Sequence, residues 1–517
     1  MTTATNLVSV LAGPAAAHPH RPALVVGDRS FDYGTVDTMA RMFAGALAGL
    51  GARPGEPVAL LLPNVPHFTV AYFGALYGGH PVVPINPLLT ADELAYHLEL
   101  SGATVVVAWE TFTAVAAEAA ARAPRARSLV IARADLADLS APEGWHNLVA
   151  VVGAATPVDG PFPSRPDDTA VLLFTSGTTG RPKAAELTHA NLLYNARAAA
   201  GLVSLGSGTV ALVALPLFHA FGMTVMHNAV LAVGGSLVLL PRFDAAAALG
   251  LIEAHGVTFF GGVPTMYAAL LAAAGPDTRL PSLRWCVSGG AAMPAAVMEA
   301  FERRFAVAVI EGYGLSETSP VVSFTVPGRP RAPGSVGYPL PGTEVRLVGD
   351  DGAEVGEPGV PGEVLVSGPG VMRGYLGDPA ATAESCPDGW LRTGDIGTWD
   401  GDGALHLVDR KKDIVIRGGF NVYPAEVERV LHEHPAVAQA AVVGVPDERL
   451  GEDVRAVVVL RPGAAVTGPE LAGFCRARLA SYKRPRTVEV WDSLPLGPTG
   501  KVLKTEVRRR RQEQGAA

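Results

Sequence analysis

Short apolar runs alternate with helical segments between residues 170 and 312, and this alternation constrains the fold more than any other feature of the chain. Apolar runs that turn residues bound predict buried strands, and strands that alternate with helices predict a parallel sheet covered by helices. Residues 22–150 alternate similarly, with strands at 58–62 and 103–107, and predict a second layer. The main run predicts strands at 170–174, 210–215, 236–240, 258–261, 283–288 and 307–311, with helices at 191–201, 245–255, 264–274 and 294–305.

The length and the later part of the chain predict further units. A chain of 517 residues is longer than one hydrophobic core usually covers, so we expect more than one domain. Between about residues 334 and 408, helical patterns give way to turns rich in glycine and proline, which indicates a small β-rich subdomain. A compact α+β unit follows, with helices near 425–434 and 469–479. We therefore expect an α/β protein with a large domain over 1–409 and a small domain over 410–517.

Composition and charge exclude several classes of protein. A formal net charge of −8 argues against nucleic acid as the main partner. Hydrophobic residues at 49% and charged residues at 17% are typical of a well-buried globular enzyme. No apolar run reaches membrane-spanning length, and the first residues lack the basic start of a secretory signal. Cys286, Cys386 and Cys475 lie far apart, as free thiols in a reducing cytoplasm do, so we expect a cytoplasmic protein.

A polar loop at residues 175–183 reads Thr-Ser-Gly-Thr-Thr-Gly-Arg-Pro-Lys and follows the predicted strand 170–174. Its glycines let the backbone N–H groups converge on one ligand, and its hydroxyls and cations suit a polyphosphate. A Walker P-loop needs Gly-Lys followed by Ser or Thr, whereas here Pro182 precedes the lysine and Ala184 follows it. The predicted polyphosphate ligands are Thr175, Ser176, Gly177, Thr178, Thr179, Gly180 and Lys183.

Two more polar loops follow predicted strands, where ligand sites of open α/β sheets gather. One loop covers residues 288–292 and the other covers residues 311–318. In the second loop, Tyr313 lies between two glycines and could lie flat against a planar base. Glu317 could hold Mg²⁺, which favours one or two carboxylates together with substrate oxygens. Taken singly, Tyr313 would be interpreted first as an ordinary half-buried tyrosine and Glu317 as a surface carboxylate.

Seven segments in order resemble the signatures of the adenylate-forming superfamily of acyl-CoA synthetases, peptide-synthetase adenylation domains and beetle luciferases. The resemblance spans about residues 21–504. It implies a ligase that forms acyl-AMP from ATP and a carboxylic acid and then transfers the acyl group to coenzyme A, with Mg²⁺ as the metal. One departure is Ala184, where relatives usually carry glycine. The segments are 175–183, 216–219, 312–317, 392–395, 409–413, 418–424 and 498–501.

The resemblance also implies roles for single residues. Lys501, Glu317 and Arg410 would be catalytic, and a compact ammonium such as that of Lys501 suits the charge that builds up at phosphorus. Asp395 would bind the ribose hydroxyls. The C-terminal domain would rotate about Lys412 and bring Gly418, Gly419 and Phe420 to the thiol channel. The nucleotide site would also include Gly290, Ala291, Glu311, Gly312, Tyr313, Gly314 and Ser316, and the metal would lie at Glu317 and Thr178.

The acyl pocket that the resemblance implies is mostly small and apolar. None of its residues is a lysine or arginine that could pair with a second carboxylate, and residues 215–223 contain no aspartate to hold an α-amine. We therefore expect a hydrophobic monocarboxylic acid, and the room beside Gly312 favours a medium- or long-chain fatty acid over an aryl acid. A lone histidine in an apolar run, such as His219, is otherwise more often a core residue. The pocket residues are His219, Phe221, Met223, Val263, Gly290, Gly312 and Val321.

Three functions compete on these residues: an acyl-CoA synthetase, an acyl-AMP ligase that loads a separate carrier protein, and a non-catalytic acyl or nucleotide binder. Lys501, Glu317 and Asp395 count against the binder, because binding alone does not need the catalytic lysine. The complete set of segments favours the coenzyme A ligase, with an aryl-acid ligase and a carrier-loading ligase as the alternatives. The sequence does not decide between a monomer and a homodimer.

Overall fold

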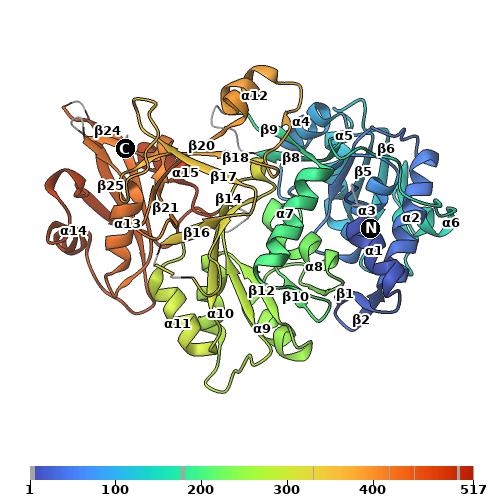
Figure 1. Cartoon of the computed structure of the whole chain (residues 1–517), viewed down its shortest axis with the longest axis horizontal. Helices are drawn as coiled ribbons and strands as arrows, with labels where there is room; N and C mark the ends of the chain where they lie inside the picture. The colour runs from blue at the N-terminus through green and yellow to red at the C-terminus, as the bar shows by residue number, and fades with distance from the viewer. Residues whose placement is uncertain are drawn as a thin grey trace.

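The computed structural model describes residues 6–175, 181–329, 331–332, 334–417, 420–447, 449–497 and 501–515. Within these residues the chain forms three sheets, which we call the N-terminal, central and C-terminal sheets. Figure 1 shows the N-terminal half of the chain at one end of the long axis and the C-terminal unit at the other. No helix in the described part of the chain is long and apolar enough to cross a membrane.

The N-terminal sheet has the order β19-β9-β8-β4-β3-β5-β6-β7, with parallel pairing from β8 to β7 and antiparallel pairing at β9 and β19. Its parallel strands are buried on both faces, as parallel strands covered by helices are. The strands are β3 (Val58–Leu61), β4 (Val82–Pro84), β5 (Val105–Trp109), β6 (Ser128–Ala132), β7 (Trp145–Asn147), β8 (Thr169–Thr175), β9 (Lys183–Thr188) and β19 (Gly374–Tyr375).

Strand β3 shows how alternate side chains build the two faces of this sheet. Val58 and Leu60 join the large core that contains α2 and α3, whereas Ala59 and Leu61 join a smaller core with α4 and α5. This is the period of two that a strand imposes on its side chains. The N-terminal helices are α1 (Ser9–Ala17), α2 (Tyr33–Gly49), α3 (Pro66–Tyr77), α4 (Ala91–Ser101), η1 (Glu110–Phe112), α5 (Thr113–Ala120) and α6 (Leu148–Ala154).

The central sheet has the order β17-β18-β20-β21-β16-β15-β14-β13-β12-β10-β11-β1-β2. Its strands from β14 to β1 pair in parallel, and the strands from β15 to β17 pair antiparallel. The strands are β1 (Pro22–Val26), β2 (Arg29–Asp32), β10 (Val210–Val213), β11 (Ser236–Leu239), β12 (Phe259–Gly262), β13 (Trp285–Ser288), β14 (Val309–Gly314), β15 (Val321–Phe324), β16 (Ser335–Pro339), β17 (Glu344–Val348), β18 (Gly362–Ser367), β20 (Leu391–Trp399) and β21 (Leu405–Arg410).

Helices and short helical turns link the strands of the central sheet. The predicted helices at 191–201, 245–255, 264–274 and 294–305 are confirmed to within a few residues as α7, α9, α10 and α11. The elements are α7 (His189–Leu202), the π-helical segment η2 (Phe221–Asn228), α8 (Ala229–Ala232), α9 (Ala245–Ala254), α10 (Pro264–Ala273), α11 (Ala295–Phe305), η3 (Ser316–Thr318), α12 (Pro379–Ser385) and η4 (Pro387–Gly389).

The sheet membership of two strands differs from the sequence prediction. Strand β8 was expected beside the strands of residues 210–311, but it pairs with β4 in the N-terminal sheet. Strand β1 lies within residues 22–150, which were expected to form the other layer, but it belongs to the central sheet. Its Leu24 and Val25 pair in parallel with Leu237 and Val238 of β11. An apolar run shows that a strand is buried on both faces, but it carries no information on which sheet buries it.

The β-rich stretch is confirmed, although it continues the central sheet instead of forming a sheet of its own. Its core contains Val322, Val336, Leu347 and Val364 together with Tyr313 of β14. Because β14 belongs to both the parallel and the antiparallel part, the loop after it lies between the α/β layer and the β-rich stretch. The loop predicted at residues 311–318 therefore begins inside β14 and continues through η3.

The C-terminal unit is built on a sheet of order β23-β22-β25-β24, with β26 on β25. Its core joins the sheet to α13 and α14. The predicted helices near 425–434 and 469–479 are confirmed as α13 and α14. The elements are η5 (Lys411–Asp413), β22 (Val415–Arg417), β23 (Phe420–Val422), α13 (Pro424–His432), β24 (Val437–Asp447), β25 (Gly451–Leu460), α14 (Gly468–Arg476), η6 (Ser481–Lys483), β26 (Thr487–Val490) and α15 (Lys504–Gly515).

Candidate active site

A cleft of about 1370 Å³ lies between the two large sheets and the C-terminal unit. Its walls bring together segments far apart in the sequence: the ends of β8 and β9, the loop after β14, an apolar wall from 215–221, and Lys501 from the C-terminal unit. Among the predicted site residues, those on its walls are Thr175, Lys183, His219, Phe221, Val263, Gly290, Gly312, Tyr313, Gly314, Ser316, Glu317, Val321, Arg410, Lys412 and Lys501.

The two ends of the predicted phosphate loop lie side by side at the edge of the cleft. Thr175 at the end of β8 pairs with Lys183 at the start of β9. The Tyr96 hydroxyl of α4 donates a hydrogen bond of 2.9 Å to the carbonyl oxygen of Pro182. This contact ties the loop's exit to a helix that begins with a Thr90–Glu93 capping box. Ser176, Gly177, Thr178, Thr179 and Gly180 lie outside the described residues.

Ala184, where glycine was the expected residue, is an ordinary strand residue in β9. It pairs with Phe174, and its carbonyl oxygen accepts a 2.8 Å hydrogen bond from the backbone of Leu376. Its side chain is buried at 1% exposure, and its φ is not among the positive values of the described residues. The backbone here therefore does not need glycine.

We expect Ala184→Gly to change the KM for ATP by less than about tenfold, roughly 1.4 kcal/mol, because the strand conformation suits either residue. The same substitution is expected to lower the free energy of unfolding by about 0.5–1 kcal/mol, since glycine loses more backbone entropy in a strand. Steady-state kinetics and denaturant unfolding test the two effects. A larger gain in ATP affinity would show that alanine distorts the loop.

A buried carboxylate, Asp395, is held by two groups that face the cleft. The Tyr313 hydroxyl donates to Asp395 Oδ2 at 2.6 Å, and Arg410 Nε pairs with Asp395 Oδ1 at 2.9 Å. Asp395 and Arg410 are register partners in β20 and β21, so the sheet itself sets their separation. Burial and the negative charge of Asp395 raise the pKa of Tyr313, which keeps its hydroxyl a donor.

Glu317 in η3 lies on the cleft wall near β9, the strand that follows the predicted phosphate loop. The Tyr375 hydroxyl of β19 donates to Glu317 Oε1 at 3.0 Å. Lys183 Nζ lies 5.0 Å from the centroid of the same tyrosine ring, in cation–π geometry. One carboxylate beside the strand that follows the predicted phosphate loop is the donor chemistry that Mg²⁺ uses together with substrate oxygens. In the described residues no group of three or more His, Cys, Asp or Glu could hold a metal by itself, so such an ion would depend on the phosphates.

Lys501 lies on the cleft wall, three residues before α15 begins at Lys504. Burial, followed by the positive charge of Arg410, lowers the pKa of Lys501 to about 8, against the opposing effect of Asp395. Burial and the charge of Lys501 lower the pKa of His219 to about 4, so this imidazole is neutral at physiological pH. The backbone N–H of Phe221 donates to His219 Nδ1 at 3.3 Å, which leaves the proton of the neutral ring on Nε2.

The apolar part of the cleft has aromatic walls. A Cβ at Gly312 would lie 2.8 Å from Cε2 of Phe324, and a Cβ at Gly289 would lie 3.1 Å from Cε1 of Phe221. Both glycines therefore make room for neighbouring rings. The space beside Gly312, which the sequence assigned to an acyl tail, holds the Phe324 ring.

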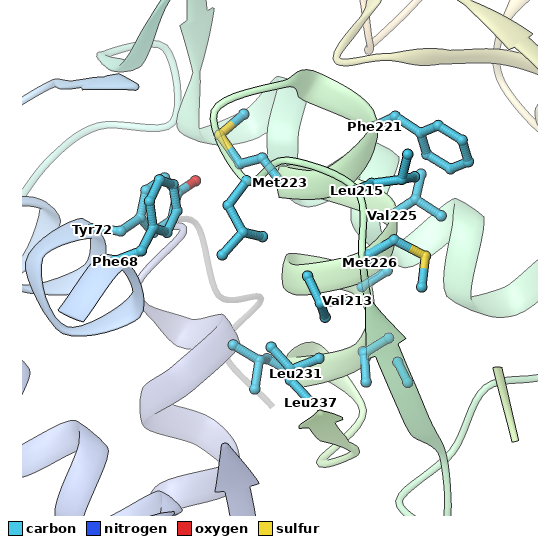
Figure 2. Close-up of a cluster of buried hydrophobic side chains, with 14 of the residues drawn as sticks. Phe68, Tyr72, Val213, Leu215, Phe221, Met223, Val225, Met226, Leu231 and Leu237 are labelled. Atoms are coloured by element: carbon cyan, nitrogen blue, oxygen red, sulfur yellow. The ribbon is translucent and has the colours of Figure 1, made fainter. Parts of the chain in front are cut away.

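The structure does not place Met223 on the wall of the acyl pocket. Met223 is fully buried, and Figure 2 shows its side chain and that of Phe221 pointing to opposite sides of the segment that begins η2. The side chain of Met223 lies on the side of α3, toward Phe68 and Tyr72 (Figure 2). The reason is helical geometry, because residues two apart on a helix do not share a face.

Other predicted nucleotide residues also lie off the cleft wall. Glu311 is buried behind it and accepts a 3.1 Å hydrogen bond from the backbone of Met293, and burial raises the pKa of Glu311 to about 7. Ala291 is exposed in the loop after β13, outside the cleft lining. Phe420 is 58% exposed and stacks on Tyr482 at 4.9 Å. Gly418 and Gly419 lie outside the described residues.

Sequence reasoning missed three residues that shape the cleft: Tyr96, Phe324 and Tyr375. Each acts on a partner from another part of the chain, for example the 58 residues that separate Tyr375 from Glu317. Phe324 could have been found by predicting a hairpin between the strand that ends near Gly314 and the next apolar run, because this antiparallel pairing places Phe324 opposite Gly312. No local signal was available for Tyr96 or Tyr375.

Comparison with known proteins agrees with this geometry. The AMP-binding enzyme family matches residues 11–376, and the AMP-binding enzyme C-terminal domain matches residues 426–501. A feruloyl-CoA synthase from an Amycolatopsis species is 41% identical over 506 residues, covering 96% of this chain and 97% of that protein. A long-chain-fatty-acid–CoA ligase from Bacillus subtilis is 36% identical over 524 residues, covering 96% of this chain and 93% of that protein.

The fold is also similar to that of a solved enzyme. The structure of an anthranilate CoA ligase in complex with anthranoyl-AMP superposes with a TM-score of 0.92 at 30% identity, covering 99% of this chain and 98% of that one. The family matches cover both the large and the small unit, and Arg410 of β21 and Lys501 of the C-terminal unit line one cleft, with the Arg410 partner Asp395 buried beside it. The chain therefore belongs to the AMP-binding enzyme family of the adenylate-forming superfamily, and it is an AMP-forming acid–CoA ligase.

Proposed function

We propose that this ligase activates a compact, hydrophobic monocarboxylic acid of the aryl or arylpropenoic class. The observation that carries the proposal is the position of Lys501. It lines one cleft together with Arg410, the partner of the buried Asp395, and with the apolar wall at residues 215–221. An acid seated on the apolar wall would present its carboxylate to the phosphates at this lysine.

In the first half-reaction, a carboxylate oxygen of the acid attacks the α-phosphorus of ATP. A bond forms between this oxygen and the α-phosphorus. The bond from the α-phosphorus to the oxygen that bridges it to the β-phosphorus breaks, and pyrophosphate leaves with the electron pair. The ammonium of Lys501 stabilises the charge that develops at the α-phosphate. Lys183 contacts the leaving phosphates, and Glu317 would hold, with Thr178, an Mg²⁺ that arrives with ATP and neutralises phosphate charge.

In the second half-reaction, the thiol sulfur of coenzyme A attacks the acyl carbonyl. The C–S bond forms, the C–O bond to AMP breaks, AMP leaves with the electron pair, and the thiol proton passes to solvent. For this step the domain of residues 410–517 turns about Lys412, which withdraws Lys501 and brings Gly418, Gly419 and Phe420 toward the thiol. The domain of residues 1–409 keeps the acyl-AMP.

The aromatic walls favour a flat acid over a long chain. Phe221 and Phe324 fill the spaces beside Gly289 and Gly312, and the sulfur of Met226 fills the space beside Gly261 behind them. Flat rings pack well between aromatic side chains in offset or edge-to-face geometry. The feruloyl-CoA synthase and the anthranilate CoA ligase support the same class, because both act on acids with a ring.

A medium- or long-chain fatty acid is the second candidate, and the similarity to the Bacillus subtilis long-chain-fatty-acid–CoA ligase favours it. An apolar pocket separates chain lengths weakly, since each methylene contributes only about 0.8 kcal/mol. The two candidates therefore need a direct test.

The test is pyrophosphate release from ATP and Mg²⁺ with benzoate, cinnamate, ferulate, hexanoate, decanoate and palmitate, each with and without coenzyme A. We expect the highest kcat/KM with a ring-containing acid and consumption of the adenylate by coenzyme A. Preference for decanoate or palmitate would establish the fatty-acid candidate. Adenylate that coenzyme A does not consume would indicate carrier loading.

The lowered pKa of Lys501 predicts that the kcat/KM for ATP falls as the pH rises, which gives a falling limb in the pH profile. Lys501 is charged below a pKa of about 8 and loses its ammonium as pH rises through that value. The kcat/KM for ATP, which reports the free enzyme, should therefore fall by about tenfold per unit well above pH 8. His219, with a pKa of about 4, stays neutral throughout and contributes nothing to this limb.

The control for this limb is Lys501→Arg, whose guanidinium stays charged over the whole range. We expect a lower rate without the falling limb. A limb that persists unchanged in this variant would assign the titration to another group.

A further inference from the structure

Tyr375 stands between the two oppositely charged side chains that face the phosphate end of the cleft. Its hydroxyl donates to Glu317 Oε1 at 3.0 Å, while the ammonium of Lys183 lies over its ring at 5.0 Å from the centroid. All three side chains are partly buried and all three line the cleft.

The backbone holds Tyr375 in a fixed relation to both partners. Strand β19 pairs with β9, where Tyr375 is opposite Ala185, next but one to Lys183. On the other side, the backbone N–H of Met372 donates to the carbonyl oxygen of Glu317 at 2.8 Å. The N–H of Tyr375 itself donates to Thr382 Oγ1 of α12 at 2.9 Å. Three neighbouring segments therefore fix the ring before any ligand arrives.

The tyrosine makes a different kind of contact with each of the two charged side chains. Its hydroxyl directs one carboxylate oxygen of Glu317 and leaves the other free for a ligand. Its ring attracts the Lys183 ammonium through the π face without neutralising its charge. Burial and the charge of Glu317 raise the pKa of Tyr375, so the hydroxyl remains a donor at any physiological pH.

We propose that Tyr375 is a positioning residue for the nucleotide: it keeps the carboxylate of Glu317 and the ammonium of Lys183 apart, so that one binds the phosphate-bound cation and the other the phosphates. The inference rests on the proposed role of Glu317 toward Mg²⁺. Without the tyrosine, the two charges would be free to pair with each other and to cancel at the site where both are needed.

The test compares Tyr375→Phe, which keeps the ring and removes the hydroxyl, with Tyr375→Leu, which removes both. The Kd of ATP is measured by titration calorimetry without any acid, once in saturating Mg²⁺ and once in EDTA. We expect Tyr375→Phe to raise the Kd about five- to tenfold in Mg²⁺ and by less than about twofold in EDTA. Tyr375→Leu should weaken binding in both conditions, because Lys183 then loses its ring as well.

Tyr194→Phe is the matched control, since Tyr194 of α7 also donates a hydrogen bond, to the carbonyl oxygen of Pro341 at 2.8 Å, but lies outside the cleft lining. It should leave both Kd values unchanged. Thermal unfolding of each variant shows whether the fold is kept. Equal weakening by Tyr375→Phe in Mg²⁺ and EDTA, or no weakening in either, would overturn the inference.

Glu317→Gln separates this inference from the function on which it rests. If Glu317→Gln weakens binding only in Mg²⁺, and Tyr375→Phe adds nothing in that background, both the role of Glu317 and its positioning by Tyr375 are supported. If Glu317→Gln weakens binding in Mg²⁺ but Tyr375→Phe does not, the inference fails while the role of Glu317 stands. If Glu317→Gln has no effect in Mg²⁺, the role of Glu317 fails and the inference falls with it.

Discussion

Lys501→Ala is expected to reduce acyl-AMP formation by about a hundred- to a thousandfold, while thioester formation from supplied acyl-AMP changes by less than about threefold. Removing one preorganised charge or donor at a developing oxyanion costs about 2.7–4 kcal/mol of transition-state stabilisation. Lys501 is one of the residues of the C-terminal unit that line the cleft, and it lies close enough to His219 to lower the pKa of that imidazole. In the proposed mechanism the domain rotation has withdrawn this ammonium before the second half-reaction, so its loss should change that rate little.

The two half-reactions are measured separately, the first by pyrophosphate release and the second by consumption of chemically prepared acyl-AMP with coenzyme A. Lys483→Ala is the control for removing a lysine from the same unit, because Lys483 pairs with Glu426 at 2.7 Å and does not line the cleft. It should leave both rates within about twofold. Equal loss of both half-reactions in Lys501→Ala would contradict a lysine that serves only one of two domain arrangements.

Asp395→Asn is expected to lower the kcat/KM for ATP by about a hundredfold, mainly through KM. The carboxylate accepts from Tyr313 at 2.6 Å and pairs with Arg410 at 2.9 Å, so the neutral amide leaves the guanidinium without its counter-charge. Hydrogen bonds to charged groups contribute about 1.5–3 kcal/mol, and loss of the contact with ribose that the family resemblance implies for Asp395 would add to that figure. Steady-state kinetics with varied ATP measures the effect.

A second readout separates an electrostatic role from loss of structure. The charge of Asp395 raises the pKa of Lys501, so its removal should move the falling pH limb to lower pH. Tyr313→Phe removes one hydrogen bond and keeps the charge, so it should weaken ATP use by no more than about tenfold and leave the limb in place. An Asp395→Asn limb at unchanged pH would show that the two groups do not interact.

Local pattern predicted the elements of the fold well. The helix predicted at 245–255 is α9 (Ala245–Ala254), and the strand predicted at 236–240 is β11 (Ser236–Leu239). Helix and strand periods are properties of neighbouring residues, so the sequence carries them directly. The assignment of β8 to the wrong sheet arose because both candidate sheets bury their strands on both faces.

Site residues that stand in recognisable sequence segments were predicted, whereas the positions of side chains that depend on packing between distant segments were not. Lys501, Arg410 and Glu317 were predicted because they stand in recognisable segments, and the structure brings all three to one cleft. Met223 was placed in the acyl pocket by its nearness to His219 in the sequence, but a helical turn directs it into the core instead. Gly312 was interpreted as room for a substrate, whereas the pairing of β14 with β15 gives that room to Phe324.

The sequence by itself determined the class of fold, because strands and helices follow from the spacing of neighbouring apolar residues. It also determined the family and the identity of the charged residues predicted to bind the nucleotide, because these stand in segments of fewer than a dozen residues. The tertiary structure decided what these residues face: the rings beside Gly289 and Gly312, the Asp395–Arg410 pair, and the tyrosine that separates Lys183 from Glu317. The physical reason is that pocket shape and charge separation arise between distant segments. They are set by sheet pairing and packing, which no local pattern encodes.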